Sequence, residues 1–139
     1  MRAQRPSGAA AALAEQAYWL AEDGELGAAL EMYRAALRRD PGNAGLMVDV
    51  GATLHRMGDA ESALRSYDEA LRAAPGLAVA LLDKGAALYS LGMYAEAAGC
   101  CREALAADPG CREAGRLLAD SKRRSRRRAP GRRAPARPR

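Results

Sequence analysis

The chain has 139 residues, enough for one modest domain, and 49% of them are apolar, so a hydrophobic core can form. Phe is absent and aromatic residues make up only 4%; because aromatic and β-branched residues favour strands, their scarcity argues against a sheet. The formal net charge of +5 is unevenly distributed, since the segment from Ser121 onward holds 10 Lys and Arg and no acid, which leaves the rest at −5. We therefore expect an all-α, acidic body that carries a basic tail.

The chain is expected to begin with an N-terminal extension at residues 1–9. Glu15 interrupts the apolar stretch that follows, so no secretory signal is predicted, and no segment approaches the roughly 18 apolar residues that span a membrane. Cys100, Cys101 and Cys111 are too few and too irregularly spaced for a disulfide framework or a metal site. These features predict a cytoplasmic protein with reduced cysteines and no metal or other cofactor.

A constant spacing of 34 residues organises the chain from residue 10 to residue 111. Proline, glycine, alanine and aromatic residues all recur at this spacing, and nine columns follow it without a gap. Five of the columns are Pro41, Pro75 and Pro109; Gly24, Gly58 and Gly92; Ala29, Ala63 and Ala97; Tyr33, Tyr67 and Cys101; and Ala17, Gly51 and Gly85.

Each column has a physical role in a pair of helices. Proline cannot continue a helix, and the Gly24 column suits the left-handed residue that closes one. Asn43 and Asp59 are expected N-caps. Small residues in the Ala17 and Ala29 columns allow two backbones to approach closely. The pattern predicts helices at 8–23, 26–39, 43–57, 60–73, 77–91, 94–107 and 111–124.

This pattern resembles the tetratricopeptide repeat, a helix–turn–helix unit of 34 residues. The resemblance implies an all-α, right-handed solenoid of three antiparallel helix pairs followed by a capping helix. The repeats would span 10–43, 44–77 and 78–111, the capping helix 112–124, and a disordered Arg- and Pro-rich tail 125–139. Such repeats bind other proteins, so we expect an interaction module, and a monomer, that binds a peptide or helix of its partner.

Family geometry places the first helix of each repeat on the concave side of the solenoid. A mostly apolar partner-binding groove is therefore expected there, formed by Ala14, Tyr18, Val48, Ala52, His55, Val79, Leu82, Ala86 and Tyr89. Tyr18 and Tyr89 would be its large contact residues, because interface energy concentrates in such anchors. Neither tyrosine lies in a column that packs the helices of a repeat together, so we expect neither to contribute to the stability of the fold.

Some members of the family bind the terminal carboxylates of chaperone peptides with Lys, Asn and Arg on these helices. The matching positions here are Ala14, Tyr18, Asp49, Val79 and Asp83. Since two of them are acidic and none is basic, that carboxylate-binding arrangement is not expected. His55 is the only histidine, and its neighbours in the sequence do not form an arrangement of Ser, Cys or acid that is typical of a catalytic site. No enzyme is predicted.

Two further surfaces have alternative interpretations. Trp19 matches Thr53 and Ala87, which should face the preceding repeat, so Trp19 would lie on an open end. Either residues 1–8 cover it, or it is a site of self-association or of contact with a partner. The tail, represented by Arg123, Arg124, Arg126, Arg127, Arg128, Arg132 and Arg133, is either a solvated extension or binds a polyanion such as nucleic acid. The second reading makes the chain a polyanion-associated protein, the alternative to a peptide-binding module.

Overall fold

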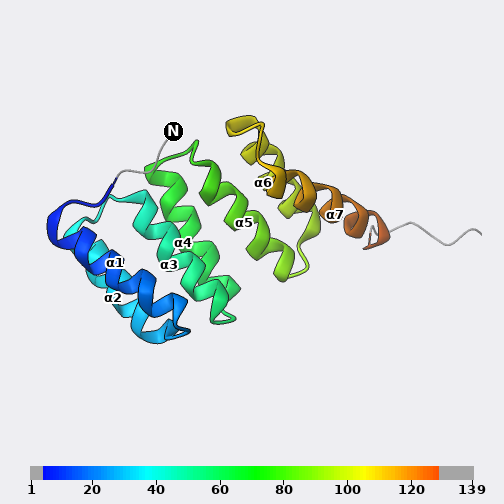
Figure 1. The fold of residues 1–139 in the computed structure, drawn as a ribbon. Helices are drawn as coiled ribbons and strands as arrows, with labels where there is room; N and C mark the ends of the chain where they lie inside the picture. The colour runs from blue at the N-terminus through cyan, green and yellow to red at the C-terminus, as the bar shows by residue number, and fades with distance from the viewer. Residues whose placement is uncertain (1–4, 129–139) are drawn as a thin grey trace, which may run out of the picture.

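The computed structural model describes residues 5–128, and within that range the only regular secondary structure is helical. Figure 1 shows the helices stacked side by side along one direction. Their bounds are α1 Gly8–Glu22, α2 Leu26–Arg39, α3 Ala44–Arg56, α4 Ala60–Ala73, α5 Ala78–Ser90, α6 Tyr94–Ala107 and α7 Arg112–Arg128. The first six lie within about one residue of the predicted bounds at each end.

Neighbouring helices pack as pairs, α1 with α2, α3 with α4 and α5 with α6, and the pairs stack through α2 with α3 and α4 with α5. Across the pairs, α3 contacts α5 and α5 contacts α7, whereas no comparable contact joins α2 to α4 or α4 to α6 in the described part. From α3 onward, the first helices and α7 therefore approach one another more closely than the second helices do. The stack curves with α1, α3 and α5 on its inner side, and the predicted all-α solenoid is confirmed.

Local sequence signals end and begin these helices. Gly24, Gly58 and Gly92 adopt φ values of 83°, 90° and 78°, a left-handed conformation that side chains with a Cβ disfavour. The Asn43 side chain accepts a hydrogen bond from the Leu46 amide at 3.1 Å, so this predicted N-cap is confirmed. Asp59, the other predicted N-cap, accepts one from the amide of Ser62.

Within each repeat the two helices meet along a row of small residues, which we call the seam. Buried tyrosine rings pack against it in the first two repeats. Ala29, Ala63 and Ala97 have no exposed surface. Tyr67 is 1% exposed, and its ring lies so close to the backbone of Gly51 that a Cβ there would be 2.6 Å from Cε1. In the third repeat the ring is replaced by Cys101, whose Sγ would lie 3.3 Å from a Cβ at Gly85. As α3 and α4 are placed here, a Cβ at Gly51 would overlap the Tyr67 ring, so a larger residue at this position would require the ring or the helix to shift.

The capping helix differs from its prediction, because α7 continues to Arg128 where residue 124 was the expected end. Residues 125–128 were assigned to a disordered tail, and that assignment is wrong. The cause lies in contacts that the sequence pattern does not contain: Arg124 lies over the rings of Tyr89 and Tyr94, and Arg128 lies over Tyr94. Arginines in the last turn also interact favourably with the negative end of the helix dipole. The rest of the expected tail, 129–139, lies outside the described residues, as do Arg132 and Arg133.

The seam predicts different outcomes for one substitution at two matching positions. Gly51→Ala should lower the free energy of unfolding by about 1–3 kcal/mol, because the buried Tyr67 ring cannot move away from the added methyl group. Gly85→Ala should be close to neutral, because the smaller Cys101 gives way and alanine favours the helix by up to about 1 kcal/mol. Urea denaturation of both variants tests this, and equal stabilities would contradict it.

Candidate functional site

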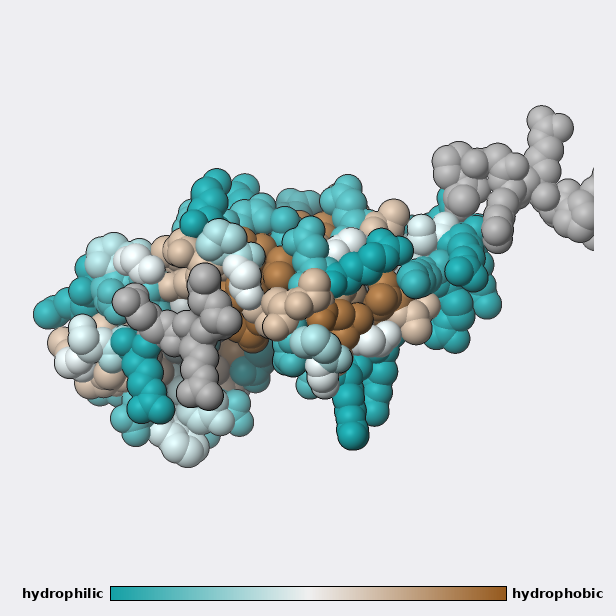
Figure 2. Space-filling view, turned by 90° about the horizontal axis from the view of Figure 1, so that it is seen from above, coloured by the Kyte–Doolittle hydropathy of each residue, from teal (hydrophilic) through white to brown (hydrophobic). Residues whose placement is uncertain are grey.

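A hollow of about 320 Å³ opens where α3 and α5 begin, on the inner side of the stack. Three residues of the predicted groove, Ala14, Val48 and Val79, line it together. Seen from above, apolar residues gather in the middle of the molecule within hydrophilic surroundings (Figure 2). The remaining lining residues are Arg5, Pro6, Asn43, Gly45, Leu46 and Asp49.

The predicted groove residues differ in how far they are accessible. Val79 is 45% exposed, whereas Val48 is only 5% exposed, so Val48 belongs to the core and forms the floor of the hollow. Ala52, Leu82 and Ala86 are half-buried. The accessible apolar surface of the inner side is therefore smaller than the sequence indicated, because the close approach of the helices buries part of it.

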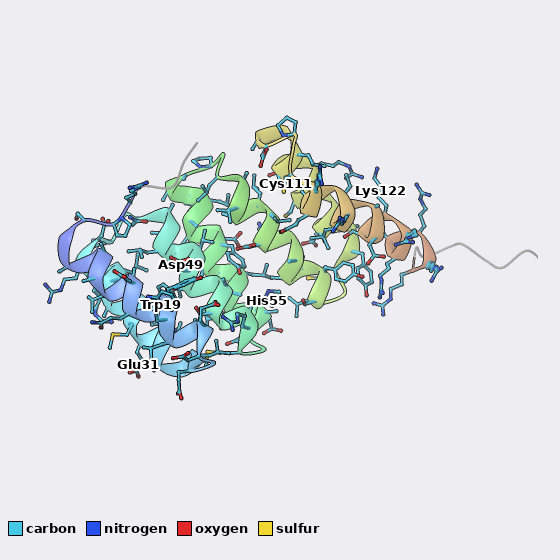
Figure 3. All side chains as sticks on the ribbon, viewed as in Figure 1. Trp19, Glu31, Asp49, His55, Cys111 and Lys122 are labelled. Carbon is cyan, nitrogen blue, oxygen red and sulfur yellow. The ribbon has the colours of Figure 1, made fainter. Side chains whose placement is uncertain are left out.

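Two carboxyl groups, Asp49 on α3 and Asp83 on α5, occupy matching positions of consecutive repeats, and both are half-buried. Burial is the main cause that raises the pKa of Asp49 from 3.8 to about 6, and the nearby Asp83 adds to it. Burial likewise raises the pKa of Asp83 to about 6, with a contribution from Glu113. Figure 3 labels Asp49 on the inner row of helices. Neither residue belongs to the groove predicted from the sequence, although their spacing of 34 residues places them in one column.

Each carboxyl group lies near a tyrosine of the preceding helix. Burial, followed by the charge of Asp49, raises the pKa of Tyr33 to about 12. Burial and the charge of Asp83 raise the pKa of Tyr67 in the same way. Within residues 5–128, no ion pair or hydrogen bond reaches the side chain of either aspartate. The nearby cations bind elsewhere: Arg56 donates to the Ala21 carbonyl at 3.1 Å, and Lys84 pairs with Asp68 at 2.7 Å.

His55 and Tyr89 occupy one column, and both reach the next first helix. His55 Nε2 lies 2.8 Å from Ser90 Oγ. The fold therefore brings His55 next to a serine that is 35 residues away in the sequence. The pair has no carboxylate partner in the described residues, and Ser90 itself donates to the Ala86 carbonyl. Tyr89 donates a hydrogen bond to Asp120 of α7. The expectation that Tyr89 holds no repeats together is therefore wrong, because superhelical stacking brings this column onto the following helix.

Several arginines assigned to the polyanion-binding tail make contacts within the fold. Arg123 pairs with Asp120 at 2.7 Å, and Arg124 lies 3.5 Å from the other oxygen of the same carboxylate. Together with the contacts of Arg124 and Arg128 to tyrosine rings, these pairs fasten α7 to α5 and α6. Arg126 and Arg127 are exposed.

Trp19 is 60% exposed, whereas the matching Thr53 and Ala87 are buried. It lies edge-to-face with Tyr18, whose side chain is 50% exposed, at a centroid distance of 5.3 Å. The end face of the first repeat is thus uncovered by the described residues, and a role for Trp19 in binding stays a prediction. No helix between residues 5 and 128 has the length and apolarity to cross a membrane.

Comparisons with known proteins agree with this architecture. Residues 51–111 match the family model of the tetratricopeptide repeat. The Sgt2 tetratricopeptide domain of Aspergillus fumigatus is 20% identical, with a TM-score of 0.85 over 96% of this chain and 91% of that one. The first such domain of Spaghetti (RPAP3), bound to the HSP90 peptide SRMEEVD, is 22% identical, with a TM-score of 0.79 over 82% and 90%.

A third solved structure, the second domain of human RPAP3 in complex with the HSP70 peptide SGPTIEEVD, is 22% identical, with a TM-score of 0.75 over 79% of this chain and 92% of that one. No curated protein matches the sequence. The family match identifies residues 51–111 as tetratricopeptide repeats, and the same 34-residue columns continue through α1 and α2.

The aspartate pair predicts an unusual dependence of stability on pH. Because the folded-state pKa of each carboxyl group is above its ordinary value, the protonated form stabilises the fold, and this contribution is lost as the pH rises through about 6. Asp49→Asn with Asp83→Asn should therefore raise the free energy of unfolding at pH 7 by about 1–3 kcal/mol and change it little at about pH 4. Urea denaturation at both pH values measures this.

The matched control for that pair is Glu31→Gln with Glu69→Gln, which removes the same charge from exposed positions of α2 and α4. This control should have little effect at either pH. A double Asn variant that is less stable than the parent at pH 7 would show that the ionised aspartates stabilise the fold.

The contact of Tyr89 with α7 gives a separate prediction. Tyr89→Ala removes the hydrogen bond to Asp120 and the ring beneath Arg124, so α7 should become less protected from amide hydrogen exchange. Tyr18→Ala should leave the exchange of α7 unchanged, since Tyr18 lies on α1, at the opposite end of the stack from α7. Mass spectrometry of both variants decides the point, and unchanged protection in Tyr89→Ala would refute the docking role.

Proposed function

We propose that the chain is a protein-interaction module that binds a short segment of a partner protein in the hollow on its inner side. The hollow lined by Ala14, Val48 and Val79 is the observation that supports this, because it joins an apolar floor to polar edges on rigid helices. Two similar structures hold peptides, SRMEEVD in one and SGPTIEEVD in the other, which supports peptide binding by this architecture. No catalytic arrangement is needed for such a role.

The same comparison argues against those particular peptides as ligands. Both peptides end in acidic residues, whereas Asp49 and Asp83 are among the positions that match the family's carboxylate-binding residues, and none of those positions is basic here. A terminal carboxylate would meet like charge at both points. The comparisons give no support to the polyanion alternative, and three of its arginines already make contacts within the fold.

The proposal predicts where binding is lost. Peptides selected from a displayed random library on the full chain should bind Val79→Asn about fivefold more weakly, because a half-exposed apolar contact in the hollow becomes polar. Isothermal calorimetry gives the affinities, and circular dichroism checks that the helices are retained. Trp19→Ala should leave the affinity unchanged. If Trp19→Ala abolishes binding while Val79→Asn does not, the end face is the binding surface.

A further inference from the structure

The inner side of the stack combines an apolar hollow with two carboxylates that have no positive partner in the described residues. Asp49 lines the hollow beside Val48 and Val79, and Asp83 is one repeat further along, on the neighbouring helix α5. Asp83 is close enough for its charge to raise the pKa of Asp49. Two half-buried negative charges near each other destabilise the folded state. Their presence at matching positions of two repeats therefore points to a role in binding another molecule.

The groups facing these carboxylates are mostly acidic or neutral. Around Asp49 they are Tyr33 on α2 and Asp83 on α5, with Tyr18, Glu22 and Arg56 acting near Tyr33. Around Asp83 they are Tyr67 on α4 and Glu113 on α7. Arg5 lines the hollow without an ion pair to Asp49. A cluster of basic residues lies instead in the last turn of α7 (Arg126, Arg127 and Arg128), so the charge on the inner side around Asp49 and Asp83 is mainly negative.

We propose that the partner segment carries a Lys or Arg side chain that binds between Asp49 and Asp83 while its apolar neighbours fill the hollow. The inference rests on the proposed function, since it names the chemistry of the peptide that the same hollow takes. A Lys or Arg side chain there relieves the repulsion between the two carboxylates and donates hydrogen bonds to their oxygens, which accept none from the described residues. An arginine can contact both acids at once through its planar guanidinium.

Helix geometry adds a preferred spacing. Helices in contact have axes about 8–10 Å apart, and an extended chain advances about 3.3 Å per residue. Since α3 contacts α5, two basic residues about three positions apart in an extended peptide would reach Asp49 and Asp83 separately. A ligand can therefore satisfy the site with one cation between the acids or with two at this spacing.

The test selects peptides of about twelve residues from a displayed random library on the full chain at pH 7.5. Selected sequences are synthesised with a fluorescent label, and their affinities are measured by anisotropy for the parent, for Asp49→Asn with Asp83→Asn, and for the control Glu31→Gln with Glu69→Gln. The labelled peptide SRMEEVD serves as an acidic probe.

Selected peptides should contain Lys or Arg among apolar residues. Their affinity should fall about tenfold or more in the double Asn variant and remain unchanged in the control, because a hydrogen bond to a charged group is lost only in the first. Lowering the pH to about 5 should weaken binding to the parent but not to the double Asn variant, since only the parent's aspartates become protonated. SRMEEVD should not bind appreciably.

Two results would overturn the inference in different ways. If peptides are selected without basic residues, or bind the double Asn variant as tightly as the parent, the charge preference is wrong but the peptide-binding groove stands. If no peptide is enriched on the full chain, the proposed function fails together with the charge preference.

Discussion

The packing of the Tyr67 ring on the bare backbone of Gly51 sets the geometry on which the other features depend. A Cβ at Gly51 would overlap this ring, so the ring or the helix α3 would have to shift from its present position. Close approach within each pair allows the pairs to stack with their first helices nearest one another. That stacking places Asp49 and Asp83 on adjacent helices of the inner side, so the acidic character of the hollow follows from a packing constraint in the core.

Polar contacts between repeats add specificity to this apolar stack. Arg56 binds the Ala21 carbonyl, His55 binds Ser90, and Tyr89 binds Asp120, so each first helix is joined to a neighbouring one. These contacts lie at the partly exposed edge of the inner side, where individual hydrogen bonds contribute modestly to stability. They fix the position of one repeat relative to the next, which a seam of Ala and Gly alone would leave freer to slide.

The fold was predictable because its signals are local and recur. Proline, glycine and cap residues at fixed spacing determine where helices begin and end, and Asn43 and Asp59 act as predicted. The site was predictable only in part. Whether Tyr89 is free or bound depends on the superhelical stacking that brings Asp120 to it, and a linear pattern does not contain that contact. The end of α7 at Arg128 depends on the same ring contacts, and the burial of Val48 depends on how tightly the helices approach.

The replacement of tyrosine by Cys101 has a consequence for how the molecule unfolds. In a solenoid each unit is stabilised mainly by its neighbours, so a less bulky side chain in one seam weakens cooperativity at that point. We therefore expect the third repeat to open at a lower free-energy cost than the second, with the hydrogen bond from Tyr89 to α7 opposing this difference. Such local opening would carry Asp83 away with α5 while Asp49 stays in place on α3. Whether a ligand meets one aspartate or both would thus depend on local unfolding of the third repeat, while the rest of the chain stays folded.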